Sequence, residues 1–158
     1  MLFTKGLGIV LLFACGGLAG VFLAQFERRR CLQAEGFVDL IRNVRLQIEC
    51  FGTPISKILA TLDDKLYTSL GAPRDCRDLD ALLAGTLLLV EREYAGLLRD
   101  FAAALGTGYR EEELRYCDYY LTRLTPLAQK ARAELEKRMR LAFVLPLALS
   151  AALILLLC

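Results

Sequence analysis

The sequence has no histidine and no tryptophan, and its six cysteines are scattered without a Cys-x-x-Cys pair. Zinc sites usually need clustered cysteine and histidine ligands, so this composition disfavours a metal centre. The chain also lacks a glycine-rich phosphate loop and the Gly-x-Ser-x-Gly elbow of serine hydrolases. We therefore expect a protein that is not an enzyme, with no catalytic residues, no metal and no cofactor.

Alternating polar and apolar residues, which indicate β-strands, are nearly absent as well. Four prolines and twelve glycines lie mostly in a few places and leave long uninterrupted segments. The net charge of +2 is small, and no basic run is interleaved with aromatic residues, so the composition does not support nucleic-acid binding. The sequence thus predicts an all-α protein that does not bind nucleic acid.

Apolar residues make up 56% of the sequence although 24% of residues are charged, and the two kinds are separated along the chain. Residues 6–26 are uncharged, and Gln25 is the only strongly polar residue among them. Residues 141–158 carry no charge either, and such a run spans about 27 Å as a helix, close to the hydrocarbon thickness of a bilayer. We therefore expect transmembrane helices at 6–26 and 141–158, with a domain at 27–140 between them.

A cleaved leader is the alternative interpretation of the first apolar run. Leu12-Phe13-Ala14-Cys15 loosely resembles a lipoprotein cleavage site, with Cys15 as the lipidated residue. However, Phe13 is bulky where a small residue is expected, and the apolar run continues for eleven residues beyond Cys15. These features favour an uncleaved transmembrane helix. Its small residues Gly16, Gly20 and Ala24 recur every four positions, which permits close approach to a second helix that offers Ala148 and Ala152.

Positive charge is concentrated at the inner ends of the two apolar runs. Lys5 is the only cationic side chain on the outer side. The positive-inside rule then places residues 27–140 in the cytoplasm, with both termini outside. The eleven cations within twenty residues of the inner ends are Arg28, Arg29, Arg30, Arg42, Arg45, Arg123, Lys130, Arg132, Lys137, Arg138 and Arg140. Among them, we expect Arg28, Arg29, Arg30, Arg138 and Arg140 to contact anionic lipid headgroups.

The central domain is predicted to be a bundle of about four to six helices. An apolar stripe predicts a helix from about Arg30 to Cys50, which ends at Gly52-Thr53-Pro54. Gly52 suits a left-handed residue, Thr53 an N-cap and Pro54 the first position of the next helix. The stripe consists of Phe37, Leu40, Ile41, Val44, Ile48 and Phe51.

The next predicted helix buries Ile55, Ile58, Leu59, Leu62 and Leu66. Gly71-Ala72-Pro73 marks a loop, and residues 79–105 predict two helices, since Leu87–Val90 is apolar on every face. After a break at Gly106-Thr107-Gly108, one long amphipathic helix begins near Tyr109 and continues into the second apolar run. The apolar stripe of this helix is Leu114, Cys117, Leu121, Leu124, Ala128, Ala131, Leu135 and Met139.

Clustered carboxylates are the remaining chemical feature. Glu111, Glu112 and Glu113 fall at a predicted helix N-terminus, where negative charge stabilises the helix; this favours a structural role over a binding site. The aspartates at 63, 64, 78 and 80 are interpreted as solvated caps and faces. The cysteines at 15, 31, 50, 76, 117 and 158 are interpreted as free thiols, small and mostly buried, in a reducing compartment.

The order of these parts resembles the stage III sporulation protein AB family of spore-forming Firmicutes, which is related to the inner-membrane platform protein of type II secretion systems (its F domain). The shared features are an N-terminal span ending in arginines and a helix closing in the turn Phe51, Gly52, Thr53, Pro54. A further helix then ends at the break Leu105, Gly106, and an acidic start opens a long helix that enters the C-terminal span. The resemblance covers essentially the whole chain.

The resemblance implies a cytosolic helical domain anchored in the outer forespore membrane. It implies a non-enzymatic platform subunit of a secretion-like channel complex in endospore formation, whose partners are a cytosolic ATPase and other membrane subunits. It does not fix the oligomeric state. We expect Glu111, Glu112 and Glu113 to contact the ATPase. The alternatives are a small membrane thiol enzyme or redox sensor that uses Cys50, Cys76 or Cys117, and a platform-like subunit of a pilus or general secretion system.

Overall fold

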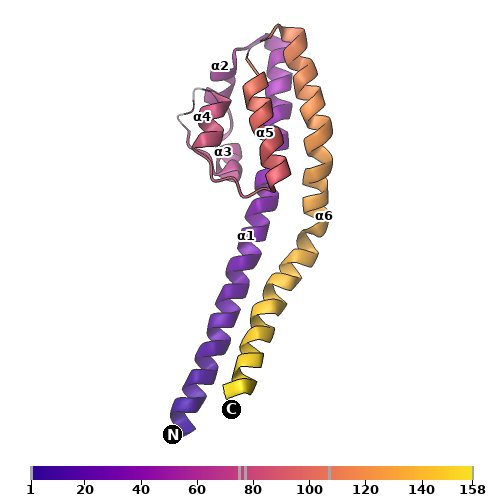
Figure 1. The fold of residues 1–158 in the computed structure, drawn as a ribbon. Helices are drawn as coiled ribbons and strands as arrows, with labels where there is room; N and C mark the ends of the chain where they lie inside the picture. Colours follow the sequence, from indigo (N-terminus) through magenta and orange to yellow (C-terminus); the bar gives the residue numbers. More distant parts are fainter. Residues whose placement is uncertain (1, 75, 77, 107, 158) are drawn as a thin grey trace. The chain divides into compact units, whose positions relative to one another are not determined.

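The computed structural model of this chain describes residues 2–74, 76, 78–106 and 108–157, and all regular structure in these ranges is helical. Six helices follow one another in these ranges, and the long first and last helices carry the apolar runs (Figure 1). The all-α prediction is confirmed. The helices are α1 (Leu2–Phe51), α2 (Ile55–Ala60), α3 (Asp64–Leu70), α4 (Leu79–Ala84), α5 (Arg92–Ala104) and α6 (Arg110–Leu157).

The chain divides into two compact units. The terminal unit comprises Met1–Arg28 and Ala133–Cys158, and the central unit comprises Arg29–Arg132. Each long helix contributes its apolar part to the terminal unit and its amphipathic part to the central unit. Both α1 and α6 contain stretches long and apolar enough to cross a membrane.

The two apolar segments of the terminal unit pack through small residues. Gly16, Gly20 and Ala24 of α1 are buried, as their spacing predicts. An added Cβ at Gly16 would lie 2.9 Å from the Ser150 hydroxyl and 3.2 Å from the Pro146 carbonyl oxygen of α6. Helices can approach this closely only where the side chain is absent.

The predicted contacts of this glycine face, Ala148 and Ala152, are wrong, since both are exposed. The α6 side that meets α1 carries Pro146 and Ser150, which are four residues apart and share one helix face. Ala148 lies midway between them in the sequence and therefore points to the opposite side. Ser150 fits in the contact because its hydroxyl donates to the Leu147 carbonyl at 2.8 Å and needs no other partner.

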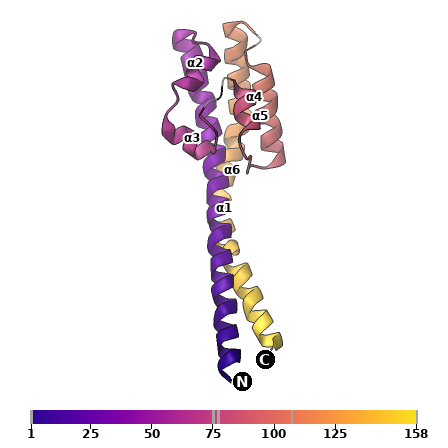
Figure 2. The same cartoon turned by 90° about the vertical axis from the view of Figure 1, so that its left-hand side faces the viewer.

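In the central unit, α1 contributes a continuous stripe of buried side chains to the hydrophobic core. Its buried stripe is the predicted one apart from Phe51, which is 73% exposed. Figure 2 shows α4 beside α5, with α2 and α3 on the α1 side of the unit. The fully buried large side chains of this core are Phe37, Leu40, Ile41, Val44, Ile58, Leu59, Leu70, Leu82, Leu98 and Leu124.

The turn after α1 has the predicted glycine conformation but a different cap. Gly52 adopts φ +58°, and its N–H donates to the Ile48 carbonyl at 3.1 Å. Pro54, at ψ 146°, is still extended, so it occupies the N-cap position and Ile55 is the first helical residue. The expectation of Thr53 as N-cap is therefore wrong by one position. The cap uses no side chain; instead the Pro54 carbonyl accepts from the Lys57 and Ile58 amides.

The single helix predicted over residues 55–66 is in fact two. Thr61 ends α2, and its hydroxyl bonds back to the Lys57 and Ile58 carbonyls. The Asp63 carboxylate then accepts from the Lys65 amide at 3.2 Å and starts α3, which contains Leu66. Gly71, at φ +68°, closes α3 at the predicted loop.

The remaining boundaries follow the sequence signals. Residues 79–105 form two helices, α4 and α5, and the apolar Leu87–Val90 lies in the connection between them. The last helix is continuous from Arg110 through Pro126 and Pro146, so neither proline ends it. Thr107, part of the predicted break, lies outside the described residues.

Candidate interaction surfaces

Two motifs singled out in the sequence, Gly52–Pro54 and Leu105-Gly106, lie at the same end of the central unit (Figure 1). Gly106 has φ +90°, and a Cβ added to it would lie 3.3 Å from Cδ1 of Ile55, the residue that follows Pro54. The Arg110 guanidinium donates to the backbone carbonyl of Glu49 in the last turn of α1. The end of α1 and the start of α6 are therefore fixed to each other, which the sequence could not reveal.

This end of the unit presents aromatic side chains to solvent. Phe51 is 73% exposed and Tyr109 is 85% exposed, so neither contributes much to the core. Large exposed aromatic side chains are enriched at protein interfaces. The arrangement therefore offers a protein-binding surface.

The acidic turn Glu111–Glu113 has the predicted position in the first turn of α6. Glu112 has a structural role, since its carboxylate accepts from the Tyr109 amide at 3.4 Å while the Glu112 amide donates to the Tyr109 carbonyl at 2.9 Å. This resembles one half of a capping box. Glu111 is exposed and Glu113 half-buried, so these two are the carboxylates left to meet a partner.

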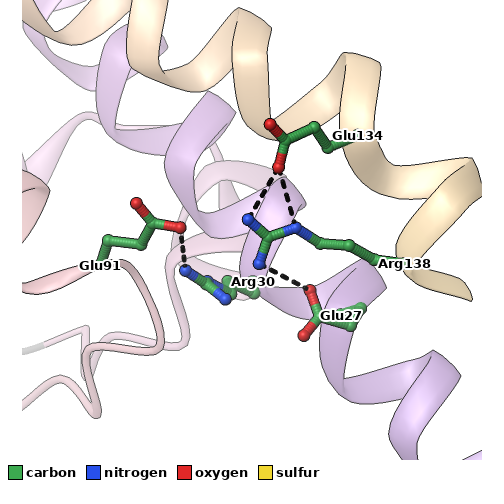
Figure 3. Close-up of polar contacts among 5 residues, drawn as sticks. All are labelled: Glu27, Arg30, Glu91, Glu134 and Arg138. Atoms are coloured by element: carbon green, nitrogen blue, oxygen red, sulfur yellow. Dashed lines mark hydrogen bonds and ion pairs between the residues drawn. The ribbon is translucent and has the colours of Figure 1, made fainter. Parts of the chain in front are cut away.

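Of the five arginines expected at the lipid headgroups, Arg30 and Arg138 form ion pairs with carboxylates. In the terminal unit, Arg138 bonds to Glu134 at 2.8 Å and lies 4.0 Å from a Glu27 carboxylate oxygen, so it links α6 to α1 (Figure 3). In the central unit, Arg30 pairs with Glu91 at 2.6 Å and connects α1 to the start of α5 (Figure 3).

Arg28, Arg29 and Arg140 are exposed. A lipid headgroup competes poorly for a guanidinium that already has a carboxylate partner. The exposed arginines are consequently better placed than Arg30 and Arg138 to contact lipid.

The cysteines in the core do not have reactive environments. Cys117 is fully buried, and this burial, reinforced by Asp118 and Glu113, raises its pKa to about 12. Burial, with a smaller contribution from Glu35, also raises the pKa of Cys31. Cys50 is exposed, and half-buried Cys76 donates its S–H to the Pro73 carbonyl at 3.3 Å. Cys158 lies outside the described residues.

One buried polar residue escaped the sequence analysis. Gln33 of α1 is 3% exposed, and its amide donates to the Leu70 and Leu87 carbonyls at 2.8 and 2.9 Å. Its side-chain oxygen accepts from the Leu89 amide at 2.7 Å. Gln33 therefore ties the end of α3 and the Leu87–Val90 connection to α1. The only sequence signal for it is its position one helical turn before Phe37, in line with the apolar stripe of α1.

Among the described residues, no group of histidine, cysteine and acidic side chains has the arrangement of a metal site. Comparison with protein-family models, with curated proteins and with solved structures gives no match for this chain. Function must therefore be argued from the chain's own residues.

Proposed function

We propose that this chain is a two-pass membrane protein whose central domain, residues 27–140, lies in the cytoplasm and works as a non-enzymatic platform subunit. One observation carries the membrane part of the proposal: large apolar side chains are exposed mainly along the two terminal segments. Leu18, Phe22 and Leu155 are 72%, 71% and 82% exposed. In water such apolar surface is costly, whereas lipid tails cover it without penalty.

The cytoplasmic side follows from charge. Eleven cations flank the inner ends of the two apolar runs, and Lys5 is the only cationic side chain at the outer ends. Arg28, Arg29 and Arg140 are exposed and available to anionic headgroups. The platform role rests on the resemblance to the stage III sporulation protein AB family, and it implies a secretion-like channel complex and a cytosolic ATPase. A platform-like subunit of a pilus or general secretion system would have the same two membrane spans and cytoplasmic helical domain.

The ATPase contact is proposed at the acidic turn. Because Glu112 caps α6, the sharpest variant leaves it intact and changes Glu111→Lys and Glu113→Lys. We expect the full-length double variant in detergent micelles to bind the ATPase at least about tenfold more weakly, with a loss that shrinks at high salt.

Asp80→Lys together with Glu93→Lys is the matched control, since these exposed residues lie in the first turns of α4 and α5. It should bind normally. Unchanged binding by a folded Glu111→Lys/Glu113→Lys variant would place the contact elsewhere on the domain.

The thiol-enzyme alternative would use Cys50, Cys76 or Cys117, and the environment of Cys117 argues against that residue. A nucleophilic cysteine needs a lowered pKa, and burial raises the pKa of Cys117 to about 12. Replacing all six cysteines by serine or alanine separates the hypotheses. A platform subunit should retain its function in vivo, whereas a thiol mechanism should lose it.

A further inference from the structure

The outward side of α6 in the central unit carries tyrosines and cations together. Tyr119 is 51% exposed and Tyr116 40% exposed, and they alternate with exposed basic residues at helical spacing. We call this surface the Tyr–Arg face. It consists of Arg115, Tyr116, Tyr119, Arg123 and Lys130.

Tyr119 is held in place by contacts that lead to the core. The Arg123 guanidinium lies 5.4 Å from the centre of the Tyr119 ring, within cation–π range. Tyr119 meets Tyr120 edge-to-face at 5.1 Å, and Tyr120 meets buried Phe101 of α5 at 5.3 Å. Side chains fixed in this way lose little conformational entropy on binding, and tyrosine and arginine are the residue types enriched in binding hot spots.

Acidic residues border the two ends of this face: Glu111 and Glu112 precede Arg115 by one helical turn, and Glu134 follows Lys130 by one turn. Asp118 is the only acidic residue between Leu114 and Ala133, and it bonds to Arg45 of α1 at 2.6 Å. In the part of the chain that the structure describes, no ion pair involves Arg115, Arg123 or Lys130. A surface complementary to these cations carries carboxylates.

A second copy of the chain does not fit this requirement. Copies anchored in one membrane have the same orientation, so two copies that meet through this face bring like residues together, Arg115 with Arg115 and Arg123 with Arg123. This step rests on the two-pass anchoring proposed above. Like charges brought together at an interface disfavour that pairing.

We propose that the Tyr–Arg face is a docking surface for an acidic segment of another protein. From Arg115 to Lys130 the face extends about 22 Å along the helix, which matches a helix of about four turns in the partner. The partner's carboxylates pair with Arg115, Arg123 and Lys130, and its apolar groups cover Tyr116 and Tyr119. The acidic turn at Glu111–Glu113 lies one helical turn before Arg115 and carries the opposite charge.

A photo-crosslinking amino acid at position 119 of the full-length protein, expressed in the cells that produce it, tests the proposal. Position 57, where Lys57 is exposed on α2, serves as the control. We expect crosslinking at 119 to exceed that at 57 at least about tenfold, with mass spectrometry identifying a protein segment rich in Asp and Glu. Arg115→Glu with Arg123→Glu should reduce the yield at 119 at least about tenfold, while Lys57→Glu with Lys65→Glu should not.

A crosslink to lipid, to a second copy of this chain or to a segment without excess acidic residues would overturn the proposal, as would equal yields at 119 and 57. An undiminished yield in the folded Arg115→Glu/Arg123→Glu variant would overturn it too. Topology reporters on the same strain separate this failure from a failure of the two-pass anchoring. If the domain is cytoplasmic and the crosslink is absent, only the docking surface is refuted.

Discussion

At the scale of single residues, the buried side chain of Gln33 should contribute strongly to stability. Its substitution by methionine keeps the volume but removes three hydrogen bonds, so the Leu70 and Leu87 carbonyls and the Leu89 amide lose their partner. Buried groups left without a partner cost roughly 1–3 kcal/mol each, and we expect Gln33→Met to lower the free energy of unfolding by about 2–4 kcal/mol in total. Gln129→Met, at an exposed position of α6, should change it by less than about 0.5 kcal/mol in the same denaturant titration.

The buried thiol of Cys117 predicts a loss of stability at alkaline pH. Its pKa is raised to about 12 in the folded state, whereas an unfolded cysteine titrates near pH 8.5. Between these values the unfolded state releases its proton and the folded state keeps it, so the free energy of unfolding falls as pH rises. The raised pKa values of Cys31, Tyr67 and Tyr120 act in the same direction.

Denaturant titrations at pH 7 and pH 9.5 measure this effect. Cys117→Ala should show a smaller stability loss between the two pH values than the unmodified chain, whatever its stability at pH 7. An equal loss in both proteins would mean that Cys117 reaches solvent in the folded state.

The contacts of single residues were the part of the molecule hardest to foresee. The ion pairs Arg45–Asp118 and Arg132–Glu35 connect α1 to α6 and join residues far apart in the sequence. Their pairing depends on how α1 and α6 are rotated about their axes, which periodicity defines only coarsely. Gln33 was missed for a related reason, since its partners are backbone groups that no side-chain pattern reveals.

At the scale of elements, two glycines should respond oppositely to the same substitution. Gly52 has φ +58° and open space around its Cα, so Gly52→Ala is strained by the backbone alone and should cost about 1 kcal/mol, and Gly52→Val roughly 1–2 kcal/mol or more. Gly96 lies inside α5 with equally open space, so Gly96→Ala should gain up to about 1 kcal/mol. Denaturant titration of the three variants provides the comparison, and equal stability of all three would contradict the turn.

Element boundaries were predictable wherever a local signal marks them. Gly52 and Gly71 take left-handed conformations at the predicted helix ends, and Asp63 and Asp78 cap α3 and α4. The split between α2 and α3 was missed because Ile55–Leu66 keeps its apolar spacing across the break. The helix breaks there because the Thr61 hydroxyl donates to the Lys57 and Ile58 carbonyls at the end of α2. The Asp63 carboxylate then accepts from the Lys65 amide and starts a new helix.

At the scale of the whole molecule, hydropathy and charge divide the chain in the same way. The exposed apolar side chains of the terminal unit and the eleven cations beside its inner ends are separate observations. One concerns the tertiary structure and the other the sequence alone. Both are explained if the chain crosses a bilayer twice and keeps residues 27–140 in the cytoplasm.

The topology is the central claim, and a pair of reporters fused after residue 158 tests it most directly. Alkaline phosphatase folds to its active form only outside the cytoplasm, and a conventional green fluorescent protein is bright only inside it. The two-pass account predicts high phosphatase activity and no fluorescence at the C-terminus, with the reverse when the reporters are inserted at residue 72 in the loop between α3 and α4. Bright fluorescence with no phosphatase activity after residue 158 would contradict it.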